Sequence, residues 1–236
     1  MNKIWVISLG GSLIAPGEIS LEFLSDFCTR IRQILMDFPE DIRNANTKIV
    51  IICGGGSLAR KYQTAYQALA EEPKDERTDW IGIAATKLNA ELIRQLLIDI
   101  TPEKVVTNPS EINSFSGKVL VAAGWKPGFS HDYGAVILAE RLNASEIIKL
   151  SSSNQIYNSD PIINPKAKSY KKMKWHDLQK LTGNHWTPGF HSPFDPIATK
   201  KASEQKIRLI VAGKNMENFQ NIIEGREFIG TTVGPD

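Results

Sequence analysis

The chain has 236 residues, of which 42% are hydrophobic and 23% charged, with a formal net charge of +2. That composition is ordinary for a folded globular protein and argues against a disordered chain. The small net charge gives no reason to expect a nucleic-acid partner, because surfaces that bind nucleic acids concentrate lysine and arginine. Cys28 and Cys53 have neither metal-site spacing nor the pattern of a disulfide framework.

Short apolar runs alternate with amphipathic patterns along the whole sequence. In chain order they predict a strand at 3–9, a helix at 21–38, a strand at 48–53, helices at 57–70 and 79–98, a strand at 118–123, a helix at 133–142, a strand at 147–150, a helix at 196–204 and a strand at 207–212. Such alternation is typical of one parallel sheet covered by helices.

Two segments lack this periodicity and are predicted to be loops. Residues 71–78 are charged and contain Pro73, and residues 158–193 are rich in proline. No apolar stretch reaches the roughly 18 residues of a membrane-spanning helix. The apolar run near the start is too short for a signal peptide, so we expect a cytoplasmic protein without a membrane partner.

Two glycine clusters stand between a predicted strand and a following helix. Gly10 and Gly11 precede Ser12, and Gly54, Gly55 and Gly56 follow the second strand. Glycine lets the backbone approach a phosphate, and helix N-terminal amides favour negative charge. One such unit can be no more than a tight turn, and neither is a P-loop or a dinucleotide fingerprint. Two units in one sheet favour a phosphate site.

A third glycine-bearing loop, GWKPGFSH at residues 124–131, leads into a predicted helix. Ser130, His131 and Asp132 occupy its cap and first turn. Asp132 can be simply a good helix-start residue, or it can orient a cationic or metal-bound phosphate. His131 can face water or contact a ligand, and the sequence leaves both readings open.

Seven segments in register resemble the amino-acid kinase family, specifically its archaeal-type uridylate kinase branch. They are ISLGGSLIAP (7–16), IICGGGSLARKY (51–62), DWIGIAATKLNAELI (79–93), KPGFSHDYGAVILAE (126–140), IYNSDPIINPKAK (156–168), FDPIATK (194–200) and GTTVGP (230–235). The resemblance implies an α/β fold, a single open α/β/α sandwich with a mainly parallel sheet, as one domain over residues 1–236. It also implies phosphoryl transfer from ATP to UMP, giving UDP and ADP, with Mg²⁺ as cofactor. Assembly as a homo-oligomer, a dimer or hexamer, is implied as well.

Roles for individual residues come from the same resemblance. The catalytic set would be Gly10, Gly11, Ser12, Asp132 and Lys200. The acceptor would be bound by Gly54, Gly55, Gly56, Arg60, Asp79, Phe129, Ser130 and His131. ATP would lie against Ser152, Asn154, Tyr157 and Asp160. No residue is predicted to ligate a metal.

Several positions depart from the family's pattern. Many family members carry a lysine just before the first glycine loop, where this chain has Ser8; the archaeal uridylate kinases that it resembles also lack that lysine, and Mg²⁺ or another lysine would supply the charge. His131 replaces a threonine, and Asn154 replaces an aspartate. These changes keep two alternatives open: a sister kinase for another phosphate, phosphonate or carboxylate acceptor, and a nucleotide-binding storage or regulatory protein with little turnover.

Overall fold

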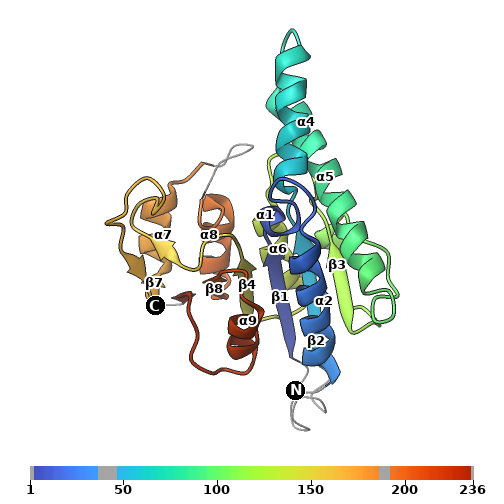
Figure 1. Cartoon of the computed structure of the whole chain (residues 1–236), viewed down its shortest axis with the longest axis vertical. Coiled ribbons are helices and arrows are strands. Elements are labelled where there is room, and N and C mark those ends of the chain that lie inside the picture. The colour runs from blue at the N-terminus through green and yellow to red at the C-terminus, as the bar shows by residue number, and fades with distance from the viewer. Residues whose placement is uncertain (1–2, 37–46, 186–191, 235–236) are drawn as a thin grey trace.

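The computed structural model describes residues 3–36, 47–185 and 192–234. Its main feature is a seven-stranded sheet with the order β3-β2-β1-β4-β8-β9-β7 (Figure 1). These strands are β1 (Ile4–Leu9), β2 (Lys48–Cys53), β3 (Val119–Ala122), β4 (Glu146–Leu150), β7 (Lys172–Lys174), β8 (Arg208–Ala212) and β9 (Thr231–Gly234). A separate antiparallel pair joins β5 (Ile156–Tyr157) to β6 (Ser169–Tyr170). Strands from both ends of the chain thus enter one sheet.

The sheet is mainly parallel, as the sequence predicted. β3, β2, β1, β4 and β8 run parallel to one another, β9 is antiparallel to β8, and β7 is parallel to β9. β1 and β2 are almost wholly buried, which explains their continuous Ile- and Val-rich runs.

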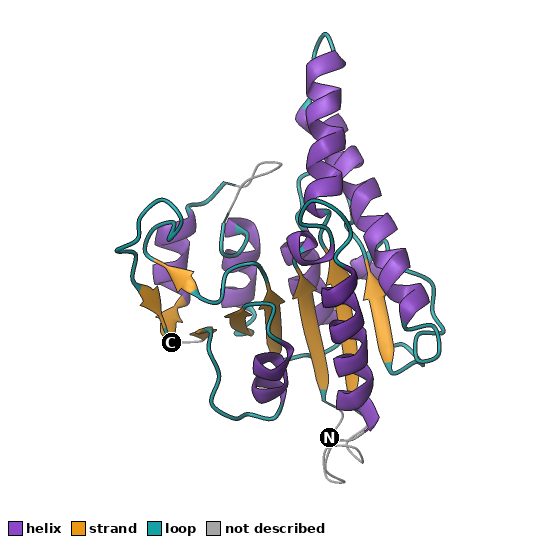
Figure 2. Cartoon of the chain, in the orientation of Figure 1, coloured by secondary structure: helices purple, strands orange, loops and turns teal. Residues whose placement is uncertain are grey.

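Helices cover both faces of the sheet (Figure 2). They are α1 (Gly11–Ile14), α2 (Leu21–Met36), α4 (Gly56–Leu69), α5 (Asp75–Leu96), α6 (His131–Arg141), α7 (Trp175–Thr182), α8 (Pro196–Glu204) and α9 (Met216–Ile223). Successive strand side chains point to opposite faces. Ile7 and Leu9 therefore pack with α2, α5 and α9, whereas Val6 packs with α6, α7 and α8. Within the described residues, no helix is long and apolar enough to cross a bilayer.

The topology brings several loops to one edge of the sheet. Parallel strands end at the same edge, so the segments after β1, β2, β3, β4 and β8 leave the sheet together. α4 and α5 pack against each other and extend well beyond the sheet (Figure 1). The two glycine clusters open α1 and α4 at this edge.

Most predicted elements are confirmed within a few residues, but two expectations were wrong and one strand was missed. α5 begins at Asp75, so residues 75–78 are helical rather than part of a loop. The segment 158–193, predicted to be irregular, contains β6, β7 and α7. β9 was not predicted, although it fills a place inside the sheet. Residues 37–38 of the predicted first helix lie outside the described residues.

Candidate active site

The first two glycine loops touch through their backbones. A Cβ atom added to Gly11 would lie 2.6 Å from the carbonyl oxygen of Gly54, and one added to Gly54 would lie 2.6 Å from the amide nitrogen of Gly11. Gly56 has φ +64°, a conformation that glycine adopts without strain. The amide of Gly10 donates to the Leu150 carbonyl at 2.8 Å, which ties the first loop to the end of β4. The ends of β1, β2 and β4 therefore form one backbone surface.

One face of α5 fixes the loops that follow β2 and β3. Asn89 Nδ2 donates to the carbonyls of Gly54 and Gly55 at 2.8 and 3.2 Å. Thr86 Oγ1 accepts from the Gly124 amide at 2.8 Å, and Asp79 Oδ2 accepts from the Gly128 amide at 2.7 Å. Residues 79, 86 and 89 share a helix face because they are seven and three positions apart. Asp79 thus positions the third loop, besides any contact with substrate.

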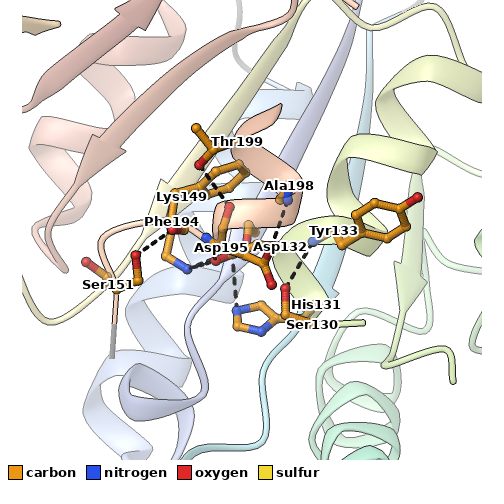
Figure 3. Close-up of polar contacts among 12 residues, drawn as sticks. Ser130, His131, Asp132, Tyr133, Lys149, Ser151, Phe194, Asp195, Ala198 and Thr199 are labelled. Atoms are coloured by element: carbon orange, nitrogen blue, oxygen red, sulfur yellow. Dashed lines mark hydrogen bonds and ion pairs between the residues drawn. The ribbon is translucent and has the colours of Figure 1, made fainter. Parts of the chain in front are cut away.

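A buried charged cluster joins Asp132 on α6, Lys149 on β4 and Ser8, which lies two residues before Gly10; Figure 3 shows its Asp132 and Lys149. Lys149 Nζ donates to both carboxylate oxygens of Asp132, at 2.6 Å to Oδ1 and 2.5 Å to Oδ2. Ser8 Oγ donates to Oδ1 at 2.6 Å, and the backbone amide of Asp195 donates to Oδ2 at 3.3 Å. Four donor contacts converge on one carboxylate. Such an arrangement stabilises the ionised form of Asp132.

Burial and neighbouring charge set the protonation of this cluster. Burial by itself raises the pKa of the Asp132 carboxyl, but the charge and hydrogen bond of Lys149, together with His131 and the Ser8 hydroxyl, hold the pKa below its ordinary value. Burial lowers the pKa of His131 to about 4, so its imidazole is neutral near pH 7. Burial raises the pKa of the Asp195 carboxyl, which caps α8 by accepting from the amides of Ile197 and Ala198.

His131 lies at the junction of the second glycine loop and Asp132. Its Nε2 is 3.6 Å from Asp132 Oδ1 and would be 3.2 Å from a Cβ atom placed on Gly54. The side chain is 22% exposed, and Nε2 has no hydrogen-bond partner among the described residues. Figure 3 shows His131 and Lys149 both directed toward Asp132. The imidazole is therefore part of the site rather than a side chain facing water.

The third loop carries a row of aromatic rings. The Phe129 ring lies 4.5 Å from that of Tyr133 and 5.5 Å from that of Trp125, centroid to centroid. Lys126 Nζ lies 4.1 Å above the Trp125 ring. Ser130 Oγ caps α6 by accepting from the Tyr133 amide at 3.2 Å. Phe129 and Ser130 thus have structural partners at the positions predicted to face the acceptor.

The other predicted residues lie further out. Arg60 on α4 and Lys200 on α8 are exposed, and neither has a hydrogen bond or ion pair with a described residue. On the predicted ATP side, Ser152, Asn154 and Asp160 are exposed, and Tyr157 on β5 is half-buried. Asn154 lies against Gly213, just beyond the end of β8. The structure thus unites the glycine loops, His131 and Asp132, whereas the roles of these outer residues stay predictions.

Sequence reasoning missed Lys149, Asn89 and Asp195. Lys149 left one signal: it is a lysine inside the otherwise apolar end of a strand, EIIKL at residues 146–150. Asn89 and Asp195 looked like an ordinary helix residue and an ordinary cap. Asn89 contacts Gly54 and Gly55, and the backbone amide of Asp195 contacts Asp132. These partners lie far away in the sequence, so no local pattern marks the contacts.

Backbone amides and a buried lysine gathered at the carboxyl ends of parallel strands are suited to bind phosphate, which places this chain among the phosphate-binding α/β proteins. The particular family follows from sequence comparison. The profile of the Amino acid kinase family matches residues 3–213, and the chain belongs to that family.

Several relatives are similar over almost their whole length. Uridylate kinase from Thermoplasma volcanium is 30% identical over 99% of this chain and 98% of its own. Uridylate kinase from Methanosarcina acetivorans is 34% identical over 94% of this chain and 91% of its own. The crystal structure of uridylate kinase from Archaeoglobus fulgidus matches with a TM-score of 0.80 and 27% identity, covering 98% of this chain and 99% of that one.

Proposed function

We propose that this chain is a kinase that transfers the γ-phosphoryl group of ATP to UMP, giving UDP and ADP. The observation that carries the proposal is the contact between the loops of Gly11 and Gly54 beside the Asp132–Lys149 pair. Phosphoryl transfer needs two phosphates aligned face to face and their charge neutralised, and the protein supplies little covalent chemistry. Similarity to uridylate kinases over nearly the full length of both chains supports UMP as the acceptor.

The residues divide the work by position. The amides of the first loop would hold the transferred phosphoryl group, and those of the second loop, with the guanidinium of Arg60, would hold the acceptor phosphate. Asp132 cannot act as a free base, because donors occupy both of its oxygens. The reaction requires no general base, since the phosphate of a nucleoside monophosphate is already largely ionised at neutral pH.

Mg²⁺ would arrive together with ATP. The described residues contain no group of three or more His, Cys, Asp or Glu side chains that could hold a metal ion. Mg²⁺ in kinases is commonly bound by one or two carboxylates together with substrate phosphates. When bound, it would neutralise phosphate charge.

Three further expectations belong to the same proposal. Residues 1–236 would form one domain, the protein would be cytoplasmic, and it would assemble as a dimer or hexamer. Exposed apolar side chains on the early helices, Leu21 on α2 and Leu69 on α4, offer surface for such contacts. Light scattering of the purified chain measures the assembly directly.

A coupled ADP-release assay tests the activity. ATP and Mg²⁺ are supplied with a panel of nucleoside monophosphates and small phosphorylated or carboxylated acids, and products are identified by chromatography. UMP should give UDP and ADP in equal amounts. Turnover with another acceptor but not with UMP would overturn the proposal that UMP is the acceptor. ATP binding without any acceptor-dependent release of ADP would overturn the proposed kinase activity.

A further inference from the structure

Lys149 is the one lysine or arginine with a buried side chain in the part of the chain that the structure describes. It lies at the end of β4, in the middle of the sheet, with 8% of its side chain exposed. An unpaired buried ammonium is strongly disfavoured, and a well-packed apolar residue commonly gives equal or better stability than an ion pair at such a position. The fold thus accommodates a costly charge directly behind a phosphate-binding loop.

The register of the sheet shows where this charge lies. Lys149 is paired with Ser8 on the adjacent strand β1, and both side chains donate to Asp132 Oδ1. Ser8 is the second residue before Gly10, and Gly10 donates to the carbonyl of Leu150, the residue after Lys149. The ammonium therefore reaches the base of the first glycine loop from the neighbouring strand.

We propose that Lys149 is a catalytic residue whose ammonium neutralises the transferred phosphoryl group, so that β4 supplies the cation for which β1 has only Ser8. This inference rests on the proposed kinase activity. An ammonium has three N–H donors, and Lys149 gives hydrogen bonds to the two oxygens of Asp132. Asp132, held ionised, fixes the ammonium in place and leaves donor capacity for a phosphate oxygen.

The charge balance of the reaction requires no proton from Lys149. An oxygen of the acceptor phosphate forms a bond to the γ-phosphorus while the bond from that phosphorus to the β,γ-bridging oxygen breaks. The electron pair of the broken bond stays on ADP. Negative charge spreads over the transferred group during the step, and a fixed cation stabilises it.

Nucleotide binding tests the proposal without any acceptor. Titration calorimetry compares the β,γ-imido analogue of ATP with ADP, each with Mg²⁺, for wild type and Lys149→Met. We expect the substitution to weaken analogue binding about tenfold or more and ADP binding by less than about threefold, because only the analogue carries the terminal phosphate. Equal losses for both nucleotides, or none, would overturn the proposal.

Kinetics and a relocated charge complete the test. Lys149→Met should lower kcat about 100-fold or more. Lys48→Met is the matched control. Lys48 is also a strand lysine, but it lies at the amino end of β2 and donates a hydrogen bond to the Phe115 carbonyl. The double variant Ser8→Lys/Lys149→Ser moves the ammonium to β1 and keeps a buried lysine beside Asp132. It should recover at least about a tenth of wild-type kcat.

The relocated variant keeps the proposal testable if Lys149→Met does not fold. Because it retains an ion pair with Asp132, we expect it to melt near the wild-type temperature. Failure to fold would mean that the lysine at position 149 is needed for structure. A folded protein without activity would mean that a cation beside Asp132 does not serve the transferred phosphoryl group. Either result would overturn the proposal. Absence of UDP from wild type would instead overturn the acceptor, and it would leave the comparison of analogue with ADP valid.

Discussion

Lys149 Nζ lies 2.5 Å from Asp132 Oδ2 and 2.6 Å from Oδ1, and neither side chain is more than 8% exposed. The pair joins β4 to the first turn of α6, the element that precedes it in the chain. Its geometry makes Asp132 an anchor for the cation rather than a proton acceptor. Breaking the Asp132–Lys149 pair is therefore expected to lower both stability and activity.

Asp132→Asn should lower both activity and stability. It removes the charge that holds Lys149, and breaking a buried pair commonly costs about 3–5 kcal/mol. We expect kcat to fall about 100-fold or more and the free energy of unfolding to fall by about 3 kcal/mol, measured by steady-state kinetics and urea denaturation. Asp99→Asn, which breaks the exposed pair with Arg32, should change the free energy of unfolding by less than about 1 kcal/mol. Near-normal kcat in Asp132→Asn would refute the anchoring role.

Gly11→Ala should separate the two glycine loops. An added methyl group would lie 2.1 Å from the Gly56 amide nitrogen and 2.5 Å from the Gly54 carbonyl carbon, and backbone cannot move aside as a flexible side chain can. We expect a loss of about 1–3 kcal/mol in the free energy of unfolding and weakened binding of both substrates. Gly17→Ala is the control, because nothing lies within 4 Å of its added Cβ. The contact between the loops would be irrelevant if the two variants behaved alike.

Arg60→Ala should weaken acceptor binding and leave stability almost unchanged. The guanidinium is exposed on α4, four residues after Gly56, and engages no described residue, so little stability should be lost. We expect the KM for UMP to rise about tenfold or more with a modest change in kcat, as for a lost charged hydrogen bond. Lys61→Ala, at the next position and paired with Glu18, serves as control. An unchanged KM for UMP would remove Arg60 from the acceptor site.

The neutral imidazole of His131 should make stability depend on pH. Its pKa is about 4 in the folded chain and about 6.5 when unfolded, so the unfolded chain binds more protons between these values. Stability should therefore fall as the pH drops from 6.5 toward 4, by at most about 3 kcal/mol. Asp195, whose pKa is raised, acts in the opposite direction below neutral pH.

His131→Gln isolates this contribution. Chemical denaturation of wild type and variant at several values between pH 4.5 and 7.5 gives the difference in slope, from which the effects of shared groups largely cancel. The variant should lose less stability than wild type on acidification. Parallel curves would show that His131 titrates normally and is not held neutral by its surroundings.

Asn89→Ala should weaken the support of the second glycine loop. Removing the amide leaves the carbonyls of Gly54 and Gly55 without this donor, at a cost of about 1–3 kcal/mol. We expect a higher KM for UMP than in Gln95→Ala, which changes an exposed residue of the same helix that bonds Glu91. The positioning role fails if the loss of stability appears without any change in KM.

Local periodicity was enough to predict the class of fold. The apolar runs of β1 and β2 and the steps of α2 reflect burial of whole strands and of one helix face, which are properties of neighbouring residues. The glycine loops were found for the same reason, because a strand, glycines and a helix start lie within a few positions. β9 and α7 were missed, since the short strand and the helix depend mainly on partners elsewhere in the chain.

The charged centre depended on tertiary structure. Ser8, Asp132 and Lys149 are separated by 124 and 17 positions, and only the order β1-β4 with α6 against this face brings them together. From sequence, the absence of a lysine before the first glycine loop was visible, but the strand that supplies a buried one was not. Strand register decides which side chains meet across a sheet, and register is a property of the folded sheet rather than of any one segment.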